Sequence, residues 1–234
     1  MLTQNNTGAR MSAEEWLCKL QEARPLVGGL FAELLQDTKL RAVAVELAQA
    51  FTAIAASLER GGTLYLCGNG GSFSDALHIS GELLKSFARP RPLSEALRAR
   101  LRAQPNGDEL AQHLQAGLRA HVLGCNPALA SAVANDIPVS GIVYAQELVA
   151  LARAGDTLLG ISTSGRARSV LLAIAAAKAL GLKTIGLTGA AGNNPLADLV
   201  DIAIRVPAGE TYRIQELHLA LYHRLCLMLE AYFF

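Results

Sequence analysis

Aromatic residues are scarce in this chain of 234 residues, at 5% of the composition, and its charges nearly cancel, leaving a formal net charge of +1. Proteins that bind nucleic acids usually present a basic surface, and those that bind single strands add aromatic side chains on which bases stack. Only residues 89–102 concentrate arginine. We therefore expect no nucleic-acid partner.

Cysteine is sparse as well, and the four cysteines are scattered without any CxxC pair. This spacing predicts reduced thiols in a cytoplasmic protein rather than a disulfide framework. The first ten residues, MLTQNNTGAR, lack the apolar core of a signal peptide. No uninterrupted apolar run is long enough to span a bilayer, so we expect no membrane segment. Because 51% of the residues are hydrophobic, a substantial core can form, and we predict a single domain over residues 1–234.

The order of apolar patterns along the chain predicts an α/β fold. Residues 12–60 have helical spacing, and Ser12 with Glu15 forms a capping-box pattern at their start. A final helix is expected from near Thr211 almost to Phe234. Between these regions, short β-rich runs alternate with helical segments, which predicts a parallel sheet with helices on both faces. The expected strands are 63–67, 157–161, 183–187 and 201–205, with a weaker one at 120–123.

Residues 89–118 interrupt this alternation. They contain two amphipathic helical pieces separated at Pro105-Asn106-Gly107. A charge-rich helical face is usually a solvated one, so a solvated helical hairpin is the simpler interpretation. A lid or an oligomer contact is the alternative.

Two glycine- and hydroxyl-rich corners follow predicted strands. Residues 68–72 read GNGGS and residues 160–165 read GISTSG, each before a helix. Glycine lets the backbone approach a ligand closely, and the free amides of a helix start favour an anion. The first corner could instead need glycine only for packing, and the second could be an ordinary Ser/Thr cap. Neither matches GxGxxG or GxxxxGK[ST], so no nucleotide cofactor is expected. In a parallel sheet both corners lie at the carboxyl edge, where ligands bind.

Two predicted helices carry titratable side chains on one face. His78 and Glu82 are four residues apart, and Gln215 and His223 are eight apart. His218 lies on a different side from His223. A single histidine is more often structural, but the set of four could form a metal site or an acid–base pair if the two helices meet.

These motifs together resemble those of a known family. The patterns CGNGGSxxDAxHxxxEL at 67–83, AND at 134–136, GDTLLGISTSG at 155–165 and RIQELHxxxxH at 213–223 are similar to the sugar isomerase (SIS) family, most closely its phosphoheptose isomerase branch. That resemblance implies a three-layer SIS fold with a five-stranded, flavodoxin-like parallel sheet, and N-terminal helices. It also implies a homotetramer with active sites at subunit boundaries.

The resemblance implies a role for each matching residue. Glu82 and His223 would be the catalytic pair for interconverting sedoheptulose 7-phosphate and D-glycero-D-manno-heptose 7-phosphate through an enediol. The same two residues, with His78 and Gln215, match the zinc ligands of some members. The residues expected to bind substrate are Asn69, Gly70, Gly71, Ser72, Asn135, Asp136, Ser162, Thr163, Ser164 and Gln215.

The sequence also departs from the family pattern. Ala167 replaces a further phosphate-binding serine, Arg166 replaces a common asparagine, Phe73 replaces a frequent histidine, and residues 89–118 lengthen the chain. These departures keep open an isomerase of a different phosphosugar and a sugar-phosphate sensor. A third alternative is a non-catalytic SIS adaptor that binds the replication initiator protein DnaA. That branch lacks residues matching Glu82 and His223, so their presence favours an enzyme.

Overall fold

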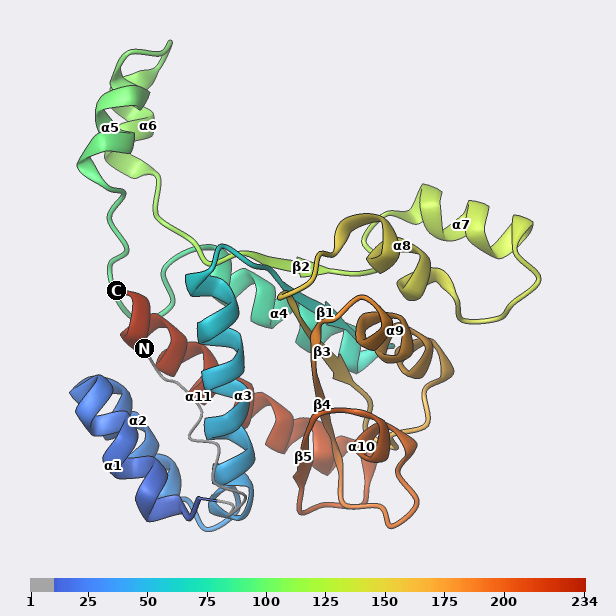
Figure 1. The fold of residues 1–234 in the computed structure, drawn as a ribbon. Coiled ribbons are helices and arrows are strands. Elements are labelled where there is room, and N and C mark those ends of the chain that lie inside the picture. Colours follow the sequence, from blue (N-terminus) through green and yellow to red (C-terminus); the bar gives the residue numbers. More distant parts are fainter. Residues whose placement is uncertain (1–10) are drawn as a thin grey trace.

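A computed structural model describes residues 11–234. The prediction that MLTQNNTGAR is not a signal peptide concerns residues outside this range. Its centre is a five-stranded, all-parallel sheet in the order β2-β1-β3-β4-β5 (Figure 1). This is the flavodoxin-like order that the resemblance implied, and the predicted α/β fold is confirmed. The strands are β1 (Leu64–Cys67), β2 (Ala120–Val122), β3 (Thr157–Ile161), β4 (Lys183–Gly189) and β5 (Ile202–Val206).

The helices cover both faces of the sheet (Figure 1). Their bounds are α1 (Ala13–Ala23), α2 (Pro25–Gln36), the 3-10 turn η1 (Arg41–Val43), α3 (Ala44–Glu59), α4 (Gly71–Leu84), α5 (Glu95–Arg102), α6 (Gly107–His113), α7 (Pro127–Asp136), α8 (Val143–Leu151), α9 (Arg168–Ala179), α10 (Pro195–Leu199) and α11 (Thr211–Phe233). The capping box is present, since the Glu15 amide donates to Ser12 Oγ and the Ser12 amide to a Glu15 carboxylate oxygen. The predicted final helix is confirmed as α11.

Two apolar clusters hold the three layers together. Side chains alternate across a strand, so Leu64 and Leu66 of β1 point to one face and Tyr65 and Cys67 to the other. The first face packs against α1 to α4 and α11, and the second against α8 to α10. Because both faces are covered, the central strands read as continuous apolar runs, which is why the sequence revealed them.

The interrupting segment folds as a helical hairpin of α5 and α6 that projects from the body of the protein (Figure 1). Asn106 between the two helices has a φ of 57°, a left-handed conformation that asparagine tolerates better than most residues. No residue of α5 is buried, as the solvated interpretation predicts. A role as a lid or oligomer contact stays a prediction.

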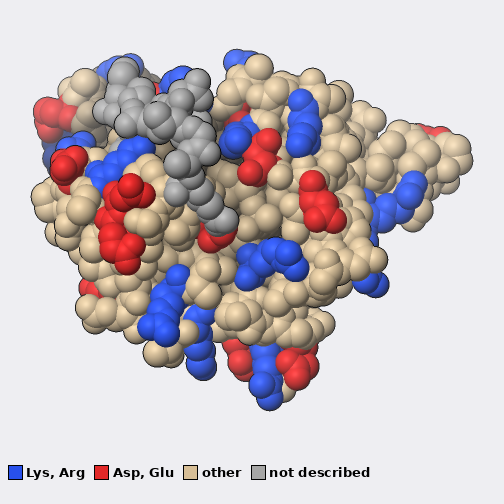
Figure 2. Space-filling model, turned by 60° about the horizontal axis from the view of Figure 1, so that its bottom comes forward, with Lys and Arg blue, Asp and Glu red and all other residues tan. Residues whose placement is uncertain are grey.

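One segment, Arg41–Glu59, has the length and apolar composition needed to cross a membrane. In this fold it forms η1 and α3, and its residues, Phe51 and Ile54 among them, are part of the larger core cluster. A core helix of a globular protein passes the same test. Figure 2 shows basic and acidic side chains interspersed on one face of the molecule, in keeping with the near-neutral charge.

Candidate active site

The two predicted corners lie next to each other at the carboxyl edge of the sheet, because β1 and β3 are hydrogen-bonded neighbours. The first corner needs glycine at two positions. A Cβ on Gly68 would lie 2.5 Å from the backbone oxygen of Ser72, and Gly70 has a φ of 56° that side chains disfavour. The Ser72 side chain is buried, so it turns away from solvent, whereas Asn69, Gly70 and Gly71 are exposed.

A hydrogen-bonded bridge joins the two corners. The Asn69 side-chain amide donates to Ser169 Oγ at 2.9 Å. The Tyr144 hydroxyl donates to Gly68 O at 2.5 Å and lies 3.1 Å from Asn69 Oδ1. Neither Ser169 nor Tyr144 was among the site residues predicted from the sequence. Ser169 had a weak signal, since it follows GISTSG by four residues at the start of α9. Tyr144 had none.

The second corner offers donors suited to an anion. Ser162 is buried, Thr163 half-buried and Ser164 exposed. The amides of Thr163 and Ser164 have no backbone or side-chain acceptor in the part of the chain that the structure describes, and α9 begins just beyond them. Free amides and hydroxyls before a helix N-terminus form a site for a phosphate group. The Arg166 guanidinium contacts the Asn193 carbonyl oxygen at 3.4 Å.

Helices α4 and α11 meet beside the first corner, which the spacing of their residues could not reveal. His78 Nε2 lies 3.1 Å from Glu82 Oε1, and His78 Nδ1 lies 2.9 Å from the Tyr222 hydroxyl. The His78 and His223 rings are 4.9 Å apart between centroids, and Phe87 contacts His223 with centroids 5.5 Å apart. The proposed acid–base pair therefore shares one site with His78.

The surroundings of His223 favour its neutral form. Burial, reinforced by the neighbouring His78, lowers the pKa of His223 from its ordinary value, and the Glu82 carboxylate opposes that shift. His223 Nε2 is buried and has no hydrogen-bond partner among residues 11–234. A neutral imidazole with an unpaired ring nitrogen can exchange a proton with a bound hydroxyl.

Gln215 lies against the first residue of α4. A Cβ on Gly71 would be 2.1 Å from Gln215 Nε2, so a larger residue there would require the Gln215 side chain to shift. The predicted zinc ligands are of donor types that zinc accepts. However, no group of three or more His, Cys, Asp or Glu side chains in the described chain is arranged to hold a metal ion. The side chains of the described residues are therefore not arranged around a zinc ion, and zinc binding stays a prediction.

Comparison with known proteins identifies the family. Residues 137–232 match one SIS domain model, and residues 32–122 match a second one. The phosphoheptose isomerase of Thermodesulfovibrio yellowstonii is 40% identical over 177 residues, which cover 76% of this chain and 75% of the relative. That of Desulfovibrio desulfuricans is 35% identical over 200 residues, 86% and 83% of the two chains. This chain belongs to the phosphoheptose isomerase family of SIS domain proteins.

Solved structures of the family agree in fold. The phosphoheptose isomerase from Neisseria gonorrhoeae superposes with a TM-score of 0.63 at 30% identity, over 88% of this chain and 97% of that one. The phosphoheptose isomerase from Francisella tularensis gives 0.65 at 27% identity, over 94% and 98%. The resemblance inferred from the motifs is confirmed.

One predicted pair of this family's site lies apart from the corners. Asn135 and Asp136 end the exposed helix α7, where the Asn135 side chain donates to Asp136 Oδ1 at 2.8 Å. Helix α7 lies beyond α8 at the outer side of the molecule (Figure 1). The loop after α7 reaches the start of α9, where Arg168 Nε donates to the Ser140 carbonyl oxygen at 3.0 Å. Asn135 and Asp136 themselves have no hydrogen bond to either corner among the described residues. Their role in binding sugar hydroxyls stays a prediction.

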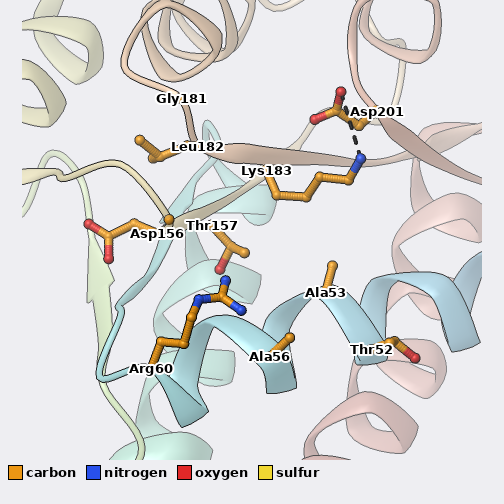
Figure 3. A pocket seen from close by; sticks show the side chains of 11 residues that line it. Thr52, Ala53, Ala56, Arg60, Asp156, Thr157, Gly181, Leu182, Lys183 and Asp201 are labelled. Atoms are coloured by element: carbon orange, nitrogen blue, oxygen red, sulfur yellow. Dashed lines mark ion pairs between the residues drawn. The ribbon is translucent and has the colours of Figure 1, made fainter. Parts of the chain in front are cut away.

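A further pocket of about 490 Å³ lies at the opposite, amino-terminal edge of the sheet (Figure 3). Arg60 and Lys183 line it together with Asp156 and Asp201, and Lys183 Nζ lies 3.9 Å from Asp201 Oδ1. Its charges therefore balance within the pocket. The pocket lies at the far ends of the strands from the two corners, so it is separate from the candidate active site.

Proposed function

We propose that this protein is a phosphoheptose isomerase that interconverts sedoheptulose 7-phosphate and D-glycero-D-manno-heptose 7-phosphate. The observation that carries the proposal is the meeting of α4 and α11. It places Glu82, His78 and His223 together beside a glycine corner, in a chain that belongs to the phosphoheptose isomerase family.

The reaction requires two proton transfers at carbon and two at oxygen. In the ketose-to-aldose direction, the Glu82 carboxylate removes a proton from C1 while an acid donates a proton to the C2 carbonyl oxygen, which gives the enediol. Glu82 then returns its proton to C2, and the C1 hydroxyl loses its proton as the aldehyde forms. His223 performs the transfers at oxygen, because its neutral ring can give a proton and take it back.

The two corners bind the remaining parts of the substrate, one the phosphate and the other the sugar. Ser162, Thr163 and Ser164 hold the phosphate with hydroxyls and free amides. Asn69, Gly70 and Gly71 lie next to them along the sugar, since β1 and β3 are adjacent. Ser72, which is buried, supports the corner from inside.

We also infer a homotetramer with active sites at subunit boundaries. The two helices that carry the proposed catalytic residues expose large apolar side chains, Leu77 and Leu84 on α4 and Tyr212 and Leu219 on α11. A second copy that covered them would bury apolar surface beside the site. Light scattering after size-exclusion chromatography would give the mass of the assembly as a multiple of the 24.7 kDa chain.

Two further expectations, zinc and a cytoplasmic location, belong to this proposal. A zinc ion, when bound, would polarise the substrate carbonyl. The residues proposed as its ligands are His78, Glu82, Gln215 and His223. The four cysteines are unpaired thiols in the structure, which supports a reducing cytoplasmic location.

The decisive experiment is an NMR time course of purified protein with sedoheptulose 7-phosphate, run with added zinc and with a chelator. New aldoheptose phosphate signals would support the isomerase, and the chelator arm would test zinc dependence. No conversion in either arm would contradict it. That result would favour an isomerase of another phosphosugar, a sugar-phosphate sensor or an adaptor for the replication initiator protein DnaA.

A further inference from the structure

A buried ion pair lies behind the proposed active site. Arg91, in the segment that leads into the α5–α6 hairpin, and Glu230, near the end of α11, are both fully buried, with Arg91 Nε 2.8 Å from Glu230 Oε1. The two residues are 139 positions apart in the sequence. Every nitrogen of a buried guanidinium needs an acceptor, so its remaining contacts show what the pair holds in place.

Arg91 closes the end of the helix that carries Glu82. Its Nη2 donates to the Glu82 carbonyl oxygen at 2.9 Å and its Nη1 to the Leu83 carbonyl oxygen at 2.7 Å. The last carbonyl groups of a helix lack partners within the helix, and a cation is favoured there. The C-cap residue, Lys85, is extended and supplies no such bond. The main chain at Glu82 is therefore fixed by Arg91.

Glu230 fixes the segment that contacts the second proposed catalytic residue. Its carboxylate accepts hydrogen bonds from the Phe87 amide at 2.8 Å and the Ala88 amide at 2.9 Å, in addition to Arg91. Phe87 in turn contacts the ring of His223 on α11. The ion pair thus contacts the main chain at Glu82 directly, through Arg91, and is linked to His223 through Glu230 and the ring of Phe87.

We propose that Arg91 and Glu230 are positioning residues for the isomerase reaction, which set the Glu82 carboxylate and the His223 imidazole relative to each other. The proposal rests on the proposed function. Stability alone is a weak reason for such a pair, because replacing a buried ion pair by apolar side chains of similar size often leaves stability unchanged or raised. A displacement of about 1 Å between reacting groups can cost about 100-fold in rate.

The test compares the double variant Arg91→Met/Glu230→Met with the single variants Arg91→Lys and Glu230→Gln. In the double variant we expect a folded protein, a KM for sedoheptulose 7-phosphate near that of the wild type and a kcat lower by about 10- to 100-fold. KM is spared because the two corners that bind substrate do not contact the ion pair. Arg91→Lys should recover part of kcat, since an ammonium group can still donate to a helix-end carbonyl.

The matched control is the exposed pair of Arg102 and Glu95 on α5, whose side chains are 44% and 71% exposed. Arg102→Met/Glu95→Met should leave both constants unchanged. Wild-type kcat in the folded double variant would overturn the proposal. If the double variant does not fold, Glu230→Gln decides, because it keeps the shape and removes the charge; a kcat equal to wild type there overturns it equally.

A second readout does not depend on turnover. The NMR signals of the His223 imidazole should shift in Glu230→Gln, because the glutamine NH2 group cannot accept a hydrogen bond and part of the hold on Phe87, Ala88 and Arg91 is lost. They should stay in place in the control pair. If the wild type shows no isomerase activity, the proposed function fails while this shift still tests the positioning role. Unmoved His223 signals would overturn the positioning role in either case.

Discussion

His218 offers the sharpest test of how the interior of this protein responds to pH. It lies on a different side of α11 from His223 and is fully buried, and neither ring nitrogen makes a well-formed hydrogen bond in the described structure. Burial lowers the pKa of His218 from 6.5 to about 4, with the backbone of Thr188 offsetting part of the effect. Because the charged form is disfavoured only in the folded state, protons bind the unfolded chain more tightly.

The sign and size of the effect follow from this difference. Above pH 6.5 both states carry a neutral His218, so its full contribution to stability is present. Between pH 6.5 and pH 4 the unfolded chain takes up a proton that the folded chain rejects, and stability falls by up to about 1.4 kcal/mol per pH unit. A change in pKa from 6.5 to about 4 corresponds to a total loss of about 3 kcal/mol.

The assay is urea unfolding of the wild type and of His218→Leu from pH 4 to pH 8, at one protein concentration so that assembly is held fixed. The wild-type free energy of unfolding should fall relative to that of the variant as the pH drops below 6.5. Carboxylates contribute to both proteins alike and cancel in the difference. A difference that does not change with pH would refute the assignment of a buried, neutral His218.

Three further substitutions test the site itself. Glu82→Gln should abolish turnover with the fold retained, and normal turnover by the isomerase assay would rule out Glu82 as the carbon base. Gly71→Ala should displace Gln215, whose Nε2 lies 2.1 Å from the added Cβ position, and lower kcat/KM by about tenfold or more. The matched control Gly81→Ala, on the same helix with nothing within 4 Å of its Cβ position, should raise the free energy of unfolding by up to about 1 kcal/mol and leave kinetics unchanged. Ser169→Ala should raise KM several-fold, because it removes a hydrogen bond that orients the glycine corner, and an unchanged KM would contradict a role for that bridge.

The fold was predictable because its signals are local. The strands are short apolar runs followed by turns. Because both faces of the sheet are covered, each strand is apolar along its whole length and can be recognised in the sequence. The two corners were also predictable, since GNGGS and GISTSG are contiguous and parallel strands end at the same edge. Even the weak strand predicted at residues 120–123 is present, as β2, and it pairs with β1.

The remaining parts of the site depend on contacts between distant segments. The bridge from Asn69 to Ser169 spans 100 residues and the contact of His78 with Tyr222 spans 144. Periodicity shows which face of a helix a residue occupies, but it does not show which face of another helix it meets. The buried position of Arg91 was hidden for the same reason, since its segment reads as a solvated, basic insertion.

The position of α7 bears on how a complete site forms. The single chain brings together the GISTSG corner, the GNGGS corner and the pair of Glu82 and His223, but Asn135 and Asp136 lie outside this group on an exposed helix. If these two residues bind sugar hydroxyls, either α7 moves or the residues serve the site of another copy. The exposed apolar side chains on α4 and α11 favour the second explanation, because they leave the active-site helices in need of a covering surface. Mixing Asn135→Ala chains with Glu82→Gln chains separates the two cases: recovered activity would require residues from different copies in one site, and no recovery would favour movement of α7 within its own chain.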